Sequence, residues 1–337
     1  MADISTSLMG LRLASPVVLG ASSLSHRVDN IKAAEDSGVG AVVIHSLFQE
    51  QIEMEAEELD LELSVGSEAF AESITYFPHL EHAGPREHLM WIEKTRGEVK
   101  APLIGSLNAT TTGNWVDYAR LLVQAGCDAL ELNLYAVQTD PGKSSAEIEE
   151  QSLEVVQAVK AAVNVPVAVK LSPFYTSVAT FAKRVAEAGA DGLVLFNRFY
   201  QPTIDINKET LKIELDLSTP EENRVSVRWL SILSGDMKTD LVGCTGVHTG
   251  EDAIRMILAG AKAVQVVSAV YRHGIEYVTK LNREVAEWMD AKGYARIEDF
   301  RGKLDQKHIS DPYAFERAQY IKLLLAQKPV AGAAHSI

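Results

Sequence analysis

Polar side chains close or interrupt several apolar runs of this 337-residue chain, and their types can support binding and proton transfer. His45 belongs to the side-chain type that titrates near neutrality when unperturbed. Asn133 and Asn197 each carry a hydrogen-bond donor and an acceptor, which suits a planar ring. Lys170 stands inside the apolar run 166–172, where it is either half of a structural salt bridge or a reactive amine. These four residues are the first candidates for a functional site.

Four ten-residue segments of the chain are similar to one another in sequence, and three of them contain His45, Asn133 or Asn197. They read SGVGAVVIHS (37–46), AGCDALELNL (125–134), AGADGLVLFN (188–197) and AGAKAVQVVS (259–268). A glycine just past a helix end takes the left-handed conformation that other residues avoid. A nearly unbroken apolar run is typical of a parallel strand that is buried on both faces. Each phrase therefore predicts a helix end, a tight turn and a buried strand whose last residues are polar.

The whole chain can be divided in the same way into eight apolar runs bounded by Gly, Pro, Asn or Asp. The predicted strands are 16–20, 41–46, 102–108, 129–134, 166–172, 192–197, 241–246 and 263–268. Helical stretches between them include 29–36, 115–125, 145–162, 178–188 and 249–259. This alternation predicts an α/β fold, a (β/α)8 TIM barrel that binds ligands at the C-terminal ends of its strands. An open doubly wound sheet is the alternative, but no G-x-G-x-x-G follows the first strand.

Three segments are longer than a barrel needs, and they are 47–100, 135–145 and 198–225. All three leave the C-terminal face, so they can cover a site there. The acidic run within the first of them, from Glu50 to Glu62, is expected to be a solvated face or loop. We expect a single domain over residues 1–325, including one or two outer helices near its end, and a loose tail over 326–337.

Composition excludes several classes of protein. A hydrophobic content of 47% allows a substantial core, and no apolar stretch approaches the roughly 18–20 residues of a membrane span. The formal net charge of −14 argues against nucleic acid or an anionic membrane as the main partner. The two cysteines suggest no disulfide framework, and the N-terminus lacks the pattern of a signal peptide. We therefore expect a cytoplasmic protein that acts on small molecules.

Several motifs, in order and on the expected strands, carry a family resemblance. They are LMGLRLASPVVLGAS at the N-terminus, ALELNL, PVAVKLSP, GCTGVHTGEDAIRMILAGAKAVQVVSAVYRHG and GYARIEDFRGKL (293–304). With these motifs the chain resembles the class 1 dihydroorotate dehydrogenases, which are FMN-dependent barrels. The resemblance extends from about Met9 to Leu304. Its first motif looks like the family's N-terminal hairpin running into strand 1.

The resemblance implies roles for individual residues. Lys170 would contact the flavin, where a cation favours the negative charge that reduced flavin gains near N1 and the C2 oxygen. Asn133 and Asn197 would face the substrate, and the phosphate would lie between strands 7 and 8. The implied FMN-binding residues are Ala21, Ser22, Ser46, Asn108, Asn133, Lys170, Asn197, Thr245, Gly246 and Ser268. A homodimer is implied, no metal is expected, and the chain has no cysteine cluster for an iron–sulfur centre. Electrons would therefore leave through a second substrate or a protein partner.

The phosphate site departs from the family pattern. The family has Gly-Gly where this chain has Thr245-Gly246, and Gly-Thr where it has Val267-Ser268. The family's Gly-rich segment after strand 6 is not visible in the sequence. Contacts from backbone N–H groups survive a change of side chain, so FMN remains the expected cofactor.

The catalytic base also departs from the pattern. The family places Ser-Cys-Pro-Asn after the strand-4 Asn, and its Cys takes the substrate proton. Ala136 occupies that position here and cannot accept a proton, which forfeits roughly 10²–10⁴ in rate. The family's substrate loop after strand 2 is replaced by the acidic, aromatic stretch 71–84, and the Lys that normally ends strand 2 is His45. Replacement acid or base candidates are His45 and Tyr135.

These observations favour an FMN-dependent oxidoreductase that moves a hydride between flavin N5 and a small planar substrate other than dihydroorotate. Its catalytic candidates are Lys170, His45 and Tyr135. Three alternatives stay open. The protein could oxidise dihydroorotate with another base. It could be a flavin-free, phosphate-binding lyase or isomerase in which Lys170 forms a Schiff base or transfers a proton. It could also be a non-catalytic binding subunit.

Overall fold

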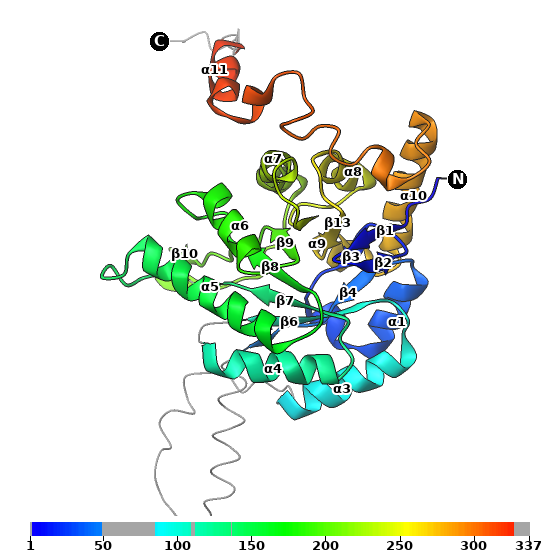
Figure 1. Ribbon diagram of the computed structural model, residues 1–337, viewed down its shortest axis with the longest axis vertical. Helices are drawn as coiled ribbons and strands as arrows, with labels where there is room; N and C mark the ends of the chain where they lie inside the picture. Colours follow the sequence, from blue (N-terminus) through cyan, green and yellow to red (C-terminus); the bar gives the residue numbers. More distant parts are fainter. Residues whose placement is uncertain (1, 49–84, 109–111, 136, 327–337) are drawn as a thin grey trace, which may run out of the picture.

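Eight parallel strands close into a barrel in the computed structural model, which describes residues 2–48, 85–108, 112–135 and 137–326 (Figure 1). The strands are β3 (Val17–Leu19), β4 (Ala41–Val43), β6 (Leu103–Asn108), β7 (Ala129–Asn133), β8 (Val167–Leu171), β9 (Gly192–Leu195), β12 (Asp240–Gly243) and β13 (Ala263–Val266). They pair in the order β4-β3-β13-β12-β9-β8-β7-β6, and the pairing of β4 with β6 closes the ring. A short strand β5 (Leu47–Phe48) extends the edge of β6. The predicted (β/α)8 barrel is confirmed, and each predicted strand overlaps an observed one.

Helices surround the strands in the alternating order that the sequence predicts (Figure 1). They are α1 (Val28–Asp36), α3 (Pro85–Glu98), α4 (Thr112–Gln124), α5 (Ser145–Ala162), α6 (Val178–Glu187), α7 (Asn223–Ser234), α8 (Gly250–Leu258), α9 (Ser268–His273), α10 (Tyr277–Lys292) and α11 (Arg317–Ala326). None of the described helices is long and apolar enough to cross a bilayer. The expected outer helix near the C-terminus is α11, which stands apart from the barrel in Figure 1.

The repeated phrases fold as predicted. Gly38, Gly126, Gly189 and Gly260 all have positive φ, between 84° and 118°, and each follows a helix and precedes a buried strand. A residue with a side chain is strained in this conformation, so glycine fixes the exit from each helix. The turn after each glycine then leads directly into a strand of the barrel.

A hairpin closes the N-terminal end of the barrel. Strands β1 (Thr6–Leu8) and β2 (Leu11–Leu13) pair antiparallel around a two-residue turn, in which Met9 and Gly10 both have positive φ. Met9 and its neighbour Leu8 are buried and pack with the inward-facing apolar residues of the strands. The expected N-terminal hairpin is therefore present, and it leaves the C-terminal end of the barrel for a site.

The barrel interior changes from apolar to polar along its axis. Successive inward-facing residues of a strand lie two apart, so Ala129 on β7 is followed by Glu131 and Asn133. Ala168 on β8 is likewise followed inward by Lys170. The alanines belong to the apolar cluster next to the hairpin, and the polar side chains come above them. This pattern places a polar layer just below the C-terminal mouth.

The three long segments differ in what the structure describes. Residues 49–84, which hold the acidic run and the stretch 71–84, lie outside the described residues, as do Ala136 and residues 327–337. Helix α3 occupies the end of the first segment and was not predicted. The segment after β9 forms a second hairpin from β10 (Thr203–Asp205) and β11 (Thr210–Lys212), followed by a 3-10 turn, η2 (Pro220–Glu222).

Candidate active site

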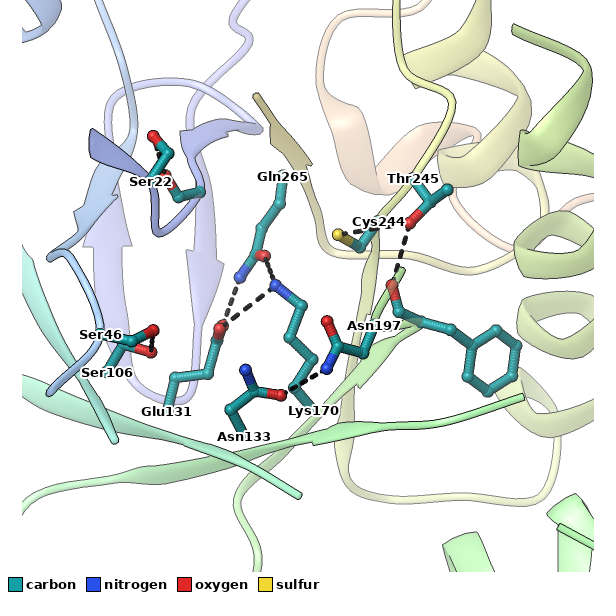
Figure 2. A network of polar contacts seen from close by, with 12 residues as sticks. Ser22, Ser46, Ser106, Glu131, Asn133, Lys170, Asn197, Cys244, Thr245 and Gln265 are labelled. Atoms are coloured by element: carbon teal, nitrogen blue, oxygen red, sulfur yellow. Dashed lines mark hydrogen bonds and ion pairs between the residues drawn. The ribbon is translucent and has the colours of Figure 1, made fainter. Parts of the chain in front are cut away.

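A buried ion pair lies in the polar layer of the barrel. The Nζ of Lys170 on β8 is 3.4 Å from Glu131 Oε1 on β7 and donates to Gln265 Oε1 on β13 at 2.9 Å. The Gln265 amide donates in turn to the other Glu131 oxygen. All three residues are buried, and Figure 2 shows their side chains pointing toward one another. The triangle therefore joins three strands of the barrel wall through one cation, one anion and one amide.

Opposing effects act on the Lys170 amine. Burial disfavours its charge, but the neighbouring Cys244 and Glu131 favour it, and the pKa of Lys170 is raised above its usual value. The side chain is therefore protonated at neutral pH. A Schiff-base lysine needs a neutral amine, so this environment works against the Schiff-base role of Lys170 in the lyase or isomerase alternative.

Glu131 and Gln265 were not predicted as site residues, because both lie inside runs that are otherwise apolar. One signal was available: Glu131 lies two residues before Asn133, and strand residues two apart face the same way. The corresponding signal for Gln265 is a single amide in an otherwise apolar strand.

A cavity of about 100 Å³ opens beside Lys170 at the C-terminal ends of β8, β9, β12 and β13; we call it the inner cavity. Its lining includes two cations, Lys170 and Arg198, and no carboxylate among the residues that the structure describes. The other lining residues are Ala21, Asn197, Tyr200, Ser218, Cys244, Thr245, Gly246, Val247, Gln265, Val267 and Ser268. Its composition suits an anionic ligand.

The expected phosphate end of the inner cavity has an unusual backbone. Thr245 and Gly246 both have positive φ, 74° and 75°. A Cβ added to Gly246 would meet the backbone nitrogen of Asn223 at 2.4 Å, so only glycine fits there. The Thr245 hydroxyl donates to the Phe196 carbonyl at 3.0 Å, which joins this turn to the end of β9.

Hydroxyl groups gather at the same end of the cavity. The Ser218 backbone N–H donates to Ser268 Oγ at 3.0 Å, and the two side-chain oxygens are 2.9 Å apart. The His248 Nε2 lies 3.2 Å from Ser218 Oγ, and burial together with nearby Arg272 lowers the pKa of His248. Ser268 was predicted here from the sequence, whereas Ser218 and His248 were not. Ser218 lies in the loop after β9, where no local pattern marks a residue that contacts Ser268, just after β13.

The other residues predicted to bind FMN or substrate lie at several strand ends around the barrel mouth. Asn197 Nδ2 donates to Asn133 Oδ1 at 2.7 Å, so the two candidate ring-binding amides meet across β7 and β9 (Figure 2). Ser46 pairs with Ser106 at 2.8 Å, and Ser22 donates to the Gly20 carbonyl at 3.3 Å. Asn108 ends β6 in register with Asn133, and Ala21 lines the inner cavity.

His45 lies in an aromatic cluster on the α3 side of the barrel. Its ring meets that of His26 edge-on at 5.4 Å, and His26 stacks on Trp91 of α3. His88, also on α3, is 6% exposed, and burial together with His45 and His26 lowers the pKa of His88 to about 4. His45 is not among the described residues that line the inner cavity, and its role as an acid or base stays a prediction.

Tyr135 stacks on Phe199, with ring centroids 4.5 Å apart and planes inclined by 25°. Phe174 meets Phe199 edge-on at 5.2 Å. The three rings come from the loops after β7, β8 and β9, which are neighbours in the sheet. Nothing tests the proton-donor role predicted for Tyr135, and the adjacent Ala136 lies outside the described residues.

The fold and the cavity define a class of protein, a (β/α)8 barrel with a cation-lined ligand site at the C-terminal ends of its strands. The family model for dihydroorotate dehydrogenase matches residues 65–289. The chain therefore belongs to the dihydroorotate dehydrogenase family, and the resemblance found in the sequence is confirmed.

Individual relatives agree with this assignment over most of their lengths. The chain is 29% identical over 310 residues to the catalytic subunit of dihydroorotate dehydrogenase B (NAD(+)) of Thermoplasma acidophilum, covering 90% of this chain and 99% of the relative. The protein of the same name from Methanosarcina mazei is 30% identical over 301 residues, covering 88% and 93%. That from Methanocaldococcus jannaschii is 28% identical over 293 residues, covering 85% and 93%. The chain is thus a divergent oxidoreductase of this family.

Proposed function

We propose that this protein is an FMN-dependent oxidoreductase that transfers a hydride between flavin N5 and a small planar substrate other than dihydroorotate. The observation that carries the proposal is the inner cavity, which a protonated lysine and a group of hydroxyls line together. FMN has the matching charges, a phosphate dianion at one end and a ring that becomes anionic on reduction at the other.

The residues present fit this cofactor. Ser268 and Ser218 would hold the phosphate, with the backbone N–H groups of the turn 245–247. Lys170 would contact the N1 and C2-oxygen edge of the ring, where the protonated amine stabilises the negative charge of the reduced form. When bound, FMN supplies a site that accepts or donates a hydride. Glu131 and Gln265 hold the lysine side chain in place.

The Ser218–Ser268 contact must change when a phosphate binds, because the two hydroxyls bond each other. We expect the segment between β9 and η2 to shift outward when FMN binds, exchanging the serine–serine bond for serine–phosphate bonds. This segment carries the exposed hairpin β10–β11 and has room to move on its outer side.

The substrate proposal rests on the sequence of the loop after β7. Ala136 stands where the family has its proton-accepting cysteine, so oxidation of dihydroorotate lacks its usual base. Tyr135 or His45 would supply the proton step for the actual substrate. We further propose a cytoplasmic homodimer over the single domain 1–325, which passes electrons to a second substrate or a protein partner.

The test has two stages. The purified protein is expected to be yellow and to release one FMN per chain on denaturation. The bound flavin, photoreduced under anaerobic conditions with EDTA as electron donor, is then expected to be reoxidised by an unsaturated planar compound. In a separate experiment, the oxidised flavin is not expected to be reduced rapidly by dihydroorotate. A colourless protein that cannot be reconstituted with FMN would refute the proposal.

A further inference from the structure

A second, larger hollow adjoins the inner cavity. It has a volume of about 410 Å³ and is lined by residues 173–174, 196–201, Glu214, Asp216, Glu222, 225–226 and Thr245; we call it the outer cleft. The two hollows share Asn197, Arg198, Tyr200 and Thr245. A molecule in the outer cleft would therefore lie directly beside whatever fills the inner cavity.

Aromatic rings form one wall of the outer cleft. Phe199 is clamped between Tyr135, which stacks on it, and Phe174, which meets it edge-on. Phe174 and Tyr200 are nonetheless 69% and 52% exposed, which leaves ring surface open to the cleft. Flat aromatic faces attract flat ligands by stacking, worth about 0.5–1.5 kcal/mol beyond burial for a ring pair.

The two cations that line the hollows, Arg198 and Lys170, already have carboxylate partners. Arg198 bonds Glu222 through Nε at 3.0 Å and also donates to the Asp216 carbonyl. Lys170 pairs with Glu131 below it. Besides Glu222, the cleft is lined by Asp216 and by Glu214, which pairs with Lys212 at 2.8 Å outside the lining, and Arg198 is the only lining cation among the described residues. A carboxylate entering the cleft would meet the Asp216 carboxylate, a Glu214 that already has its lysine, and an arginine that already has a partner.

We propose that the outer cleft is the substrate subsite and that it selects an uncharged planar ring over one that carries a carboxylate. This inference rests on the proposed function, because the ring would react with a flavin in the inner cavity. Neutral rings gain stacking and hydrogen bonds to Asn197 without disturbing an ion pair. An anionic ring must either break the Arg198–Glu222 pair or face the acidic wall.

Uracil and orotate provide a matched pair of probes, since they differ only in the carboxylate on the ring. Binding to the protein as purified, and after loading with FMN, is measured by titration calorimetry. We expect uracil to bind at least about tenfold more tightly than orotate. A factor of this size corresponds to one charged group that is left without a partner in the cleft. Phe174→Ala should weaken uracil binding about tenfold through loss of stacking, because its ring surface is open to the cleft. Tyr313→Ala, at an exposed ring outside both hollows, should change nothing.

A second variant tests the role of charge directly. Glu222→Gln keeps a hydrogen-bonding side chain next to Thr219 but leaves Arg198 without its carboxylate. Orotate affinity should then rise about fivefold or more, while uracil affinity stays the same. Equal affinities for the two rings, a tighter orotate complex in the parent protein, or no complex with either would overturn this inference. Protein that binds FMN yet prefers orotate refutes the inference alone, whereas protein that takes up no FMN refutes the proposed function.

Discussion

The two adjoining hollows at the barrel mouth differ in charge and in origin. The inner cavity is lined by two cations, hydroxyls and backbone from strand ends, with no carboxylate among the described residues. The outer cleft is lined mainly by loop residues, with aromatic rings and three carboxylates. They share Arg198, which pairs with Glu222 on the outer side.

This difference separates two tasks. Strand ends are rigid, so they can fix a cofactor that every turnover reuses, whereas loops can change their side chains without disturbing the barrel. The resemblance predicts that the strand-end residues Lys170 and Asn133 keep the family pattern and that Ala136, in the loop after β7, stands in place of the cysteine.

The largest expected effect is on dihydroorotate, the substrate that the outer cleft should reject. With FMN bound, we expect dihydroorotate to reduce the flavin roughly 10²–10⁴-fold more slowly than it does in a relative that has the cysteine, because no positioned base takes the proton. Stopped-flow absorbance measures this rate, and reduction by dithionite shows that the flavin is competent. Fast reduction would mean that another residue serves as the base and that the two hollows do not divide the tasks as proposed.

The next effect concerns the ion pair below the inner cavity. Lys170→Met leaves Glu131 buried without its cation, which should lower the free energy of unfolding by about 3 kcal/mol. The double variant Lys170→Met/Glu131→Gln removes both charges and should recover most of this loss. Urea denaturation of the three proteins measures it. If the single and double variants were equally destabilised, the pair would not be the cause.

Ligand-binding titrations of the inner cavity and the outer cleft need a pH at which the protein stays folded. The buried His88 is expected to limit how far the pH can be lowered. Its pKa is about 4 in the folded protein, against about 6.5 when unfolded, so the unfolded chain binds more protons between these values. Stability should therefore fall as the pH drops, by about 2 kcal/mol between pH 7.5 and pH 5 from this group alone. His88→Leu should remove that part of the loss, while replacement of the exposed His273 by Gln should not. Urea denaturation at both pH values measures the free energy of unfolding of each variant. If that free energy depended on pH equally with and without His88, the lowered pKa of His88 would not be the cause.

The smallest expected effect is on FMN affinity, and it tests whether Ser268 contacts the phosphate or the ring of the cofactor. Ser268→Ala removes one hydroxyl from the proposed phosphate site and should weaken FMN binding about tenfold. Riboflavin lacks the phosphate, so its affinity should not change. Quenching of flavin fluorescence on binding gives both constants. Equal weakening of the two flavins would place Ser268 elsewhere than at the phosphate.

Most of the barrel could be predicted from sequence because its signals are local. A glycine after a helix and an apolar run after the glycine mark each strand, as at Gly126 before β7. The cap of α8 was also readable, since Thr249 and Asp252 form the predicted helix start. Hairpin β10–β11 was not predicted, because its side chains are mostly exposed on both faces and leave no alternation.

The site was only partly predictable, because its contacts connect distant parts of the chain. Lys170 could be singled out as a charge in an apolar strand. Its partners could not, since Glu131 and Gln265 meet it only when the barrel closes. The same holds for Ser218, which reaches Ser268 from a loop fifty residues away. Closure of the barrel, rather than any local pattern, brings these groups together.

The most direct test is a crystal structure of the protein with FMN bound. We predict that the phosphate lies against Ser268 and that the segment after β9 is displaced outward. Lys170 Nζ should lie within hydrogen-bond distance of the flavin N1 or C2 oxygen. A flavin bound elsewhere, or an FMN-soaked crystal in which Lys170 points away from the cavity, would contradict the account.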